Sequence, residues 1–234
     1  PVMTQRSLSV KFSTVEVALD RLKAASAAAD ASLNVMFMTA VARGLHDYHR
    51  HVGADLHEIR VNMPISVRTE ADEAGGNRWV PARFVLPAGA DTAAGGIELL
   101  KPVLLQAQHD PALRMSDIVY RLLSTLPRPV TTALAGALMK GVDVAATNVP
   151  GPPIEVFMAG AKVLMLVPFA PKGGAAVNVA LISYAGRVFL GVNCDTAAVA
   201  EPDVLTDCLR AALDEVIALA DPPKPKRARR RPAR

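Results

Sequence analysis

Alternation of apolar and polar residues predicts the β-strands of this chain. The clearest case is Glu58–Val67, in which every second residue from Ile59 onward is apolar, as in a strand with one buried face. Ala185-Gly186 separates two apolar runs and is consistent with a two-residue hairpin link. The predicted strands are Ser7–Ser13, Glu58–Val67, Trp79–Leu86, a short strand from Val144 to Asn148, Lys162–Val167, Ala175–Tyr184 and Arg187–Asn193.

Apolar residues spaced three or four apart predict helices between these strands. One such stripe begins after Asn34, a good N-cap residue, and ends before Gly53, a residue typical of helix ends. The predicted helices run from a cap at Ser13 or Thr14 to about Ala29, from Asn34 to Gly53, and over Asp91–Gln108, Pro111–Thr125, Pro129–Lys140 and Pro202–Ala220, with a Gly-rich turn at Asp72–Asn77.

Interleaved helices and strands predict an α/β sandwich built on a mixed sheet. The chain has 234 residues, of which 51% are hydrophobic and 21% charged, which is enough to bury a core. Its longest stretch without a charge, Gly173–Gly186, has 14 residues, whereas a membrane-spanning helix needs about 20. No signal peptide is visible. We therefore expect a cytoplasmic protein, with peripheral contact to a membrane left open.

Positive charge is concentrated at the C-terminus. The net charge is +4, yet residues 221–234 hold seven basic side chains and one acid, so the remainder is slightly acidic. We predict one domain over residues 1–220 and a disordered basic tail over residues 221–234. The tail is interpreted as a solubilising segment, with docking to anionic lipid as an alternative. Binding of the tail to nucleic acid is the least favoured interpretation, because the tail has no aromatic residue on which bases could stack.

Composition and spacing alone indicate no reaction. His46, His49 and His51 lie near one predicted helix end, but their spacing fits no known zinc site, so we predict no metal. Cys194 and Cys208 are interpreted as small hydrophobic residues rather than nucleophiles. The sequence contains no G-x-S-x-G, Walker A or G-x-G-x-x-G pattern.

Four segments of the chain carry a resemblance to a known family. They are Leu33-Asn34-Val35 before an apolar helix, Met63-Pro64-Ile65-Ser66-Val67-Arg68 followed by Gly76-Asn77-Arg78, Thr147-Asn148-Val149-Pro150-Gly151-Pro152, and the run from Val177 to Arg187. Over about Ser7–Ala220 the chain resembles the C-terminal half of the bacterial wax ester synthase/diacylglycerol acyltransferases. The most specific part is the N-V-P-G-P segment, followed by the strand entry at Met158–Val163.

The resemblance implies one half of a chloramphenicol-acetyltransferase-like fold, in which two α/β halves meet at a tunnel. It implies transfer of an acyl group from acyl-CoA, a co-substrate, to a long-chain alcohol or a diacylglycerol, with no bound cofactor. The family's general-base histidine belongs to an H-H-x-x-x-D-G motif in the N-terminal half. This chain has no His-His pair and begins at Pro1. We therefore expect it to contain no catalytic residue and to be inactive without an N-terminal half.

The partners that follow are acyl-CoA, the acceptor alcohol or diacylglycerol, and the N-terminal catalytic half, with a membrane or lipid-droplet surface left open. The alternative function is a stand-alone, non-catalytic module that binds lipid or another protein. An upstream reading frame without the H-H-x-x-x-D-G segment would favour this alternative.

Five residues are predicted to bind substrate. Thr147 and Asn148 stand at a strand end before a Pro-Gly-Pro turn, which suits a rigid donor to an oxyanion; the alternative for Asn148 is a bond to the turn backbone. Asn77 and Arg78 follow the Gly-rich turn, where Arg78 either meets a CoA phosphate or forms a surface ion pair. Asn34 opens a helix where the family usually has Asn-Asp. This chain has a valine in place of that acid, which leaves the role of the pair open.

Overall fold

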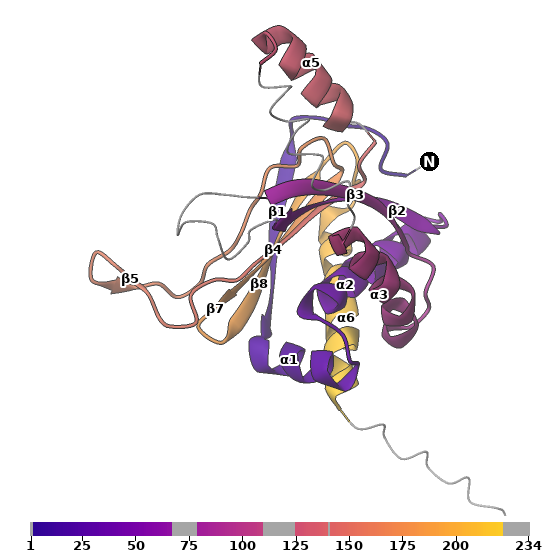
Figure 1. The fold of residues 1–234 in the computed structure, drawn as a ribbon. Coiled ribbons are helices and arrows are strands. Elements are labelled where there is room, and N and C mark those ends of the chain that lie inside the picture. The colour runs from indigo at the N-terminus through magenta and orange to yellow at the C-terminus, as the bar shows by residue number, and fades with distance from the viewer. Residues whose placement is uncertain (1, 67–78, 110–124, 140, 222–234) are drawn as a thin grey trace, which may run out of the picture.

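The computed structural model describes residues 2–66, 79–109, 125–139 and 141–221. A six-stranded sheet carries helices on one face, and a small hairpin projects from the body (Figure 1). The helices are α1 (Leu19–Ala28), α2 (Leu33–His51), α3 (Ala93–His109), α5 (Arg128–Met139), α6 (Pro202–Ile217) and the 3-10 turn η1 (Ala218–Ala220). The strands are β1 (Val10–Ala18), β2 (Glu58–Ser66), β3 (Trp79–Pro87), β4 (Val144–Val149), β5 (Phe157–Met158), β6 (Ala161–Lys162), β7 (Val177–Tyr184) and β8 (Arg187–Asp195).

The large sheet is mixed, with strand order β1-β8-β7-β4-β2-β3. Strand β4 runs parallel to both β2 and β7, whereas β8 is antiparallel to its neighbours β1 and β7. Strands β1, β2, β4 and β7 therefore all point the same way and end at one edge of the sheet. In Figure 1 this carboxyl edge lies toward α1, which begins directly after β1 ends. Ligands of open α/β sheets bind outside such carboxyl edges, so a ligand-binding site is expected at this edge.

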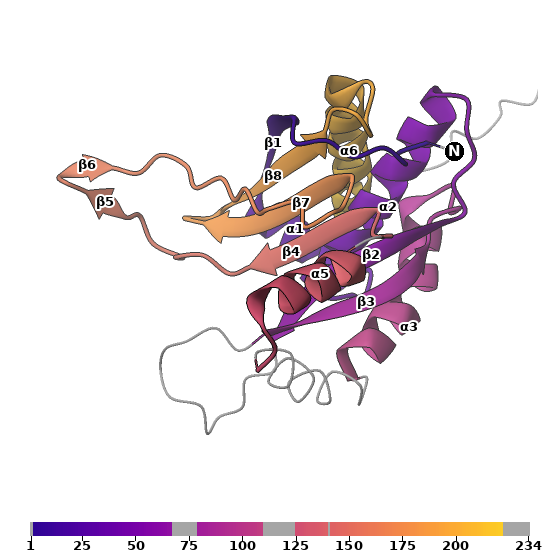
Figure 2. The same ribbon diagram turned by 90° about the horizontal axis from the view of Figure 1, so that it is seen from above.

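The main core lies between the sheet and α2, α3 and α6, which pack side by side (Figure 2). Met36, Phe37 and Met38 on α2 are fully buried in it, so they are core residues, as the sequence favours. These layers confirm the predicted mixed-sheet α/β fold. Among the described residues no single helix is long and apolar enough to cross a membrane; α1 and α2 pass by length and composition only as a pair, bent by 96°.

The opposite face of the sheet is crossed by a long excursion between β4 and β7. Its outer part, residues 154–165, forms a projecting arm that contains β5 and β6 (Figures 1 and 2). Its returning part, residues 168–172, is a strap that lies on β8 and β7. Gly191 is required beneath the strap, since a Cβ there would lie 1.7 Å from the carbonyl oxygen of Pro168. The strap therefore packs directly against the backbone of β8.

Most of the predicted elements are confirmed. Strands β2, β3, β4, β7 and β8 and helices α3, α5 and α6 lie within a few residues of the predicted bounds. The hairpin at Ala185-Gly186 is confirmed too, and both residues have positive φ, 44° and 81°, as a type I′ hairpin turn requires. Helix α2 has the predicted extent, and Gly53 follows it with φ of 73°.

The predicted boundary between the first strand and the first helix is wrong. Instead of a strand over Ser7–Ser13 and then a helix, β1 continues to Ala18, and the helix begins only at Leu19. The physical reason is pairing: Val15 and Val17 lie opposite Leu190 and Val188 of β8. Tertiary contacts with β8 thus override the helical spacing of the same residues.

Two further predictions need correction. Ser32 rather than Asn34 caps α2, because its side-chain oxygen accepts the N–H of Val35 at 3.2 Å. Lys162–Val167 is not a strand beyond Lys162, because the carbonyl of Val163 bonds to a tyrosine hydroxyl instead of a neighbouring strand. The predicted turn at Asp72–Asn77, most of the predicted helix Pro111–Thr125 and nearly all of the basic tail lie outside the described residues, so the predicted domain division stays a prediction.

Candidate functional site

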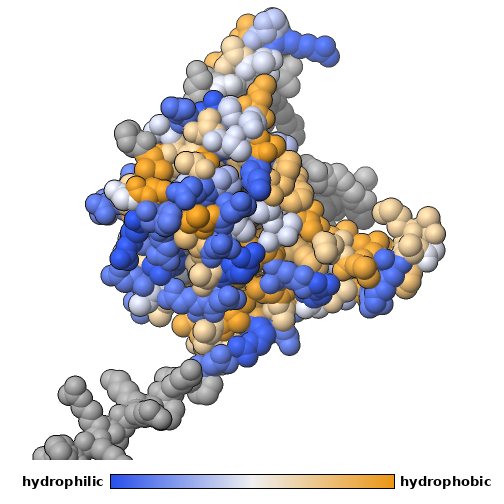
Figure 3. Space-filling view, turned by 180° about the vertical axis from the view of Figure 1, so that it is seen from behind, coloured by the Kyte–Doolittle hydropathy of each residue, from blue (hydrophilic) through white to orange (hydrophobic). Residues whose placement is uncertain are grey.

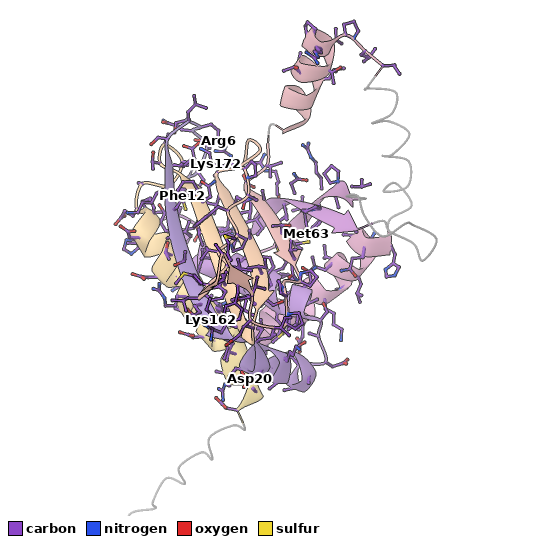
Figure 4. The ribbon with its side chains drawn as sticks, turned by 90° about the vertical axis from the view of Figure 1, so that its left-hand side faces the viewer. Arg6, Phe12, Asp20, Met63, Lys162 and Lys172 are labelled. Atoms are coloured by element: carbon purple, nitrogen blue, oxygen red, sulfur yellow. The ribbon has the colours of Figure 1, made fainter. Side chains whose placement is uncertain are left out.

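An apolar pocket of about 350 Å³ lies at the carboxyl edge of the sheet. Its wall combines the first turns of α1, the start of α2, the end of β4 and the hairpin between β7 and β8. Figure 4 marks the two edges of the sheet, with Lys172 and Arg6 beyond the start of β1 and Asp20, in α1, beyond its end. The residues lining the pocket are Leu19, Leu22, Lys23, Leu33, Asn148, Pro150, Gly151, Pro152, Pro153, Leu181, Ser183, Tyr184, Ala185, Gly186 and Val188.

The Pro-Gly-Pro turn after β4 is fixed against β7, which explains why this wall is rigid. The backbone N–H of Gly151 donates to the Ser183 hydroxyl at 3.2 Å. A Cβ on Gly151 would lie 2.0 Å from the Ser183 carbonyl oxygen, so only glycine allows the approach. The N–H of Ala185 donates to the Pro152 carbonyl at 3.1 Å. These contacts hold the end of β4 in place beside the pocket.

The structure separates the two residues predicted at the end of β4. Val144 and Ala146 are buried in the core under the helices, and side chains alternate along a strand, so Asn148 shares that face and Thr147 faces the other way. Asn148 lines the pocket. Its side chain is exposed and has no hydrogen bond with the described residues, so the alternative bond to the turn backbone is not seen. Thr147 does not line the pocket.

Asn34 lies at the same edge as Asn148. It sits in the first turn of α2, next to pocket-lining Leu33, and its side-chain N–H₂ approaches the sulfur of Met63 near the end of β2 at 3.7 Å. No acidic residue occupies this first turn. The partial positive charge of the helix N-terminus is therefore not neutralised from within the helix. Asn77 and Arg78 lie outside the described residues.

The described residues that line the pocket include no histidine, aspartate or glutamate that could act as a general base. Of its described lining residues only Lys23 carries a formal charge, and it is exposed. The hydroxyl of Tyr184 accepts the N–H of Val156 at 2.9 Å and donates to the carbonyl of Val163 at 2.8 Å, so it is engaged elsewhere. The remaining described surface is mainly apolar, with two polar side chains, the amide of Asn148 and the hydroxyl of Ser183, which accepts the N–H of Gly151. Such a surface suits a hydrocarbon chain next to a few polar groups.

Burial disfavours the reactive thiolate form of both cysteines. Burial raises the pKa of the Cys194 thiol to about 12, and burial also raises the pKa of Cys208. A thiol with a raised pKa is a poor nucleophile because only the thiolate attacks. Within the described part of the chain, no group of three or more His, Cys, Asp or Glu side chains could hold a metal ion.

The sequence did not point to the arm as a functional element. Tyr184 is buried and fastens the base of the arm by bonding Val156 on one limb and Val163 on the other. The arm nevertheless exposes large apolar side chains, with Phe157 61% and Met158 72% exposed. Seen from behind, it projects from the body and carries hydrophobic next to hydrophilic side chains (Figure 3). Exposed apolar patches of this kind mark interaction surfaces.

Comparison with known sequences connects this site to a family. The model of the family described as WS/DGAT C-terminal domain matches residues 98–216, just over half of the chain. A protein of Mycobacterium tuberculosis, provisionally named a diacylglycerol O-acyltransferase, is 30% identical over 226 residues, which are 97% of this chain and 46% of the relative. Another from that organism, named Tgs4, is 27% identical over 91% of this chain and 46% of its own length. The chain thus spans about half the length of the curated relatives it matches.

Solved structures show the same fold. A wax ester synthase/diacylglycerol acyltransferase from Marinobacter aquaeolei VT8 has a TM-score of 0.65 at 19% identity, over 94% of this chain and 52% of that chain. A condensation-domain structure from the enacyloxin polyketide synthase has a TM-score of 0.59 at 16% identity, over 93% of this chain and 42% of that one. At these identities the likeness concerns the fold alone.

Proposed function

Because this chain belongs to the family of WS/DGAT C-terminal domains, we propose that it forms the C-terminal half of an acyl-CoA-dependent O-acyltransferase. The acceptor is a long-chain alcohol or a diacylglycerol, and the product is a wax ester or a triacylglycerol. The observation that carries the proposal is the family match, together with an apolar pocket at the carboxyl edge of the sheet. Coverage of only 46% of the curated relatives supports a half-enzyme.

In this proposal the chain supplies surface and positioning rather than the base. A histidine of the N-terminal half takes the hydroxyl proton as the oxygen attacks the thioester carbonyl. The resulting oxyanion needs donors that are already in place, and the amide of Asn148 at the pocket wall is one such group in the described part of this chain. Collapse of the intermediate forms the ester and releases CoA thiolate, which takes up a proton. The apolar wall holds the acyl chain, and no cofactor takes part.

The arm supports the part of the proposal that concerns an N-terminal half. Its exposed Phe157 and Met158 would be costly to leave in water, since burying apolar surface contributes about 25 cal/mol per Å². A hairpin that is fastened at its base and exposes these side chains is suited to insert into a second folded unit. We propose that this unit is the N-terminal half.

The direct test is turnover by the parent protein, expressed with whatever its gene places before Pro1. With a long-chain acyl-CoA and either hexadecanol or a diacylglycerol, free thiol and ester should appear in equal amounts. Thiol release without ester would contradict the proposal, and a parent that carries no segment before Pro1 would favour the non-catalytic module.

Asn148 offers a sharper test with an internal control. Asn148→Leu should lower kcat/KM of the parent by about 100-fold or more if its amide stabilises the oxyanion. Thr147→Val, one residue away on the opposite face, should have little effect. Equal losses in the two variants would remove Asn148 from the mechanism.

A further inference from the structure

An aromatic pair on the open face of the sheet, away from the helices, is exposed to solvent. Phe12 of β1 and Phe169 of the strap meet edge to face, with ring centroids 4.8 Å apart. Their side chains are 50% and 45% exposed, and Figure 4 labels Phe12 on β1. Val10 lies two residues before Phe12 on the same strand, hence on the same face, and is exposed as well. Val10, Phe12 and Phe169 together form what we call the aromatic patch.

The strap is fixed on both sides of Phe169. Before it, the carbonyl of Pro168 lies so close to β8 that only a glycine fits beneath, at Gly191. After it, the carbonyl of Ala170 accepts a side-chain N–H of Asn193 at 3.2 Å. Phe169 is therefore presented by a backbone that is already held in place. An aromatic residue that is ordered before docking loses less conformational entropy when a partner binds it.

Two buried asparagines hold the strap while their own acceptors stay unpaired. Asn193 and Asn178 lie directly opposite each other on β8 and β7, and they are only 6% and 4% exposed. Asn178 donates to the carbonyl of Pro171 at 3.3 Å. Because a carbonyl only accepts, both amide nitrogens must face the strap, and both Oδ1 atoms are buried without a hydrogen-bond partner among the described residues. Such an acceptor lowers stability, and conflicts of this kind are expected where a protein maintains a functional feature.

The aromatic patch has the composition of a protein interface, in which exposed aromatic residues and methionines are enriched. Leu164 and Met165, which connect the arm to the strap, are exposed too, so exposed apolar residues follow the chain from the arm to the patch. The chain covers 46% of its curated relative, which leaves a second half as the partner. We propose that the aromatic patch is a second docking surface for the N-terminal half, in addition to the arm, and that Asn178 and Asn193 are its positioning residues. This inference rests on the proposed function, which supplies the partner.

The test uses the parent protein with a protease site inserted before Pro1. The protein is cleaved after it has folded, so that neither piece has to fold alone. Serial dilution, followed by analytical ultracentrifugation, gives the concentration at which half of the two pieces have separated. Phe12→Ser with Phe169→Ser should raise this concentration about tenfold or more, as expected for aromatic residues at the centre of an interface.

A matched control pair lies on α3, on the helix-covered face of the sheet. Leu99→Ser with Leu105→Ser removes two apolar side chains that are each 47% exposed, and should leave the half-separation concentration unchanged. Equal increases in the two pairs, or wild-type pieces that show no association, would overturn the proposal. Self-association of the 234-residue chain that disappears in the phenylalanine variant would assign the aromatic patch to a second copy and overturn it as well.

Asn193→Ala tests the positioning role with both phenylalanines in place. In the ¹⁵N-labelled 234-residue chain, the amide order parameter of Phe169 should fall below the value of about 0.85 that is typical of rigid backbone. In the cleaved parent, the half-separation concentration should rise about threefold or more. Asn62→Ala is the control, since Asn62 also has a buried, unpaired Oδ1 on β2 but no printed bond joins it to the strap, and it should change neither quantity. A mobile Phe169 with unchanged association, or equal changes in the two variants, would overturn the positioning role.

Ester formation by the same cleaved samples separates this inference from the proposed function. Pieces that associate through the aromatic patch but form no ester from acyl-CoA and a long-chain alcohol or diacylglycerol would contradict the proposed function alone. Ester formation together with an unchanged half-separation concentration in Phe12→Ser with Phe169→Ser would contradict the docking surface alone.

Discussion

Tyr184→Phe is expected to loosen the arm while leaving the body of the domain folded. The hydroxyl of Tyr184 makes two hydrogen bonds, one with Val156 at 2.9 Å and one with Val163 at 2.8 Å. A neutral hydrogen bond contributes about 0.5–1.5 kcal/mol net, so the two together stabilise the closed base of the arm by about 1–3 kcal/mol. The ring stays buried in the variant, because phenylalanine differs only by the hydroxyl. The loss should therefore be local to the arm.

Amide hydrogen exchange measures this local opening. The N–H of Val163 donates to the carbonyl of Val156 across the base of the arm. Its protection should fall about tenfold in the variant, which corresponds to about 1.4 kcal/mol, while amides of β8 such as Leu190 keep their protection. Tyr48→Phe is the control, since the Tyr48 hydroxyl accepts the N–H of Glu201 at 3.4 Å and makes no bond to the arm. Unchanged protection at Val163, or an equal loss throughout the sheet, would refute the reasoning.

Three other changes test the packing of the strap and the buried polar groups. Gly191→Ala should destabilise the fold by about 1–3 kcal/mol in urea unfolding, because the new methyl group collides with Pro168; a stability equal to wild type would mean that the strap is not seated there. Burial opposes ionisation of Asp195, but its bonds with Lys172, Ser7 and Ala197 outweigh this and hold its pKa below the usual range. Lys172→Met should thus lower the unfolding free energy by about 3–5 kcal/mol at pH 7. The difference in stability between variant and wild type should shrink as acid protonates Asp195, and a difference that grows in acid would contradict this. Burial lowers the pKa of His49, so the unfolding free energy should decline as pH falls below about 6.5, where the unfolded chain takes up the proton first. This decline should be smaller in His49→Asn, and an equal decline in the variant would contradict the reasoning.

Local pattern was sufficient to predict the central sheet and its helices. The alternation in β2 and the two-residue link at Ala185-Gly186 depend on neighbours in sequence, and both are confirmed. The register of β1 was not predictable, because its residues fit either a helix or a strand until β8 pairs with them. The cap of α2 was also ambiguous, since Ser32 and Asn34 are both good capping residues and only the backbone geometry distinguishes them.

The candidate site was predictable in part. Asn148 was singled out from its place before a Pro-Gly-Pro turn, and the structure puts it at the pocket wall. Thr147 was chosen by the same reasoning but faces away from the pocket. The turn that follows a six-residue strand does not determine which of its alternating side chains lie on the pocket side. Exposure of Phe157 and Met158 could not be read from the sequence, because an apolar pair predicts burial unless the surrounding fold is known.

Complementation between separately expressed halves tests the central claim most directly. The 234-residue chain is mixed with the part of its parent that precedes Pro1, and ester formation from acyl-CoA and a long-chain alcohol or diacylglycerol is followed. The account predicts no product from either piece alone and turnover that saturates at equal amounts of the two. Phe157→Ser with Met158→Ser should raise the concentration needed for saturation, whereas the exposed pair Val130→Ser with Leu134→Ser on α5 should not. Ester made by the 234-residue chain alone would contradict the account.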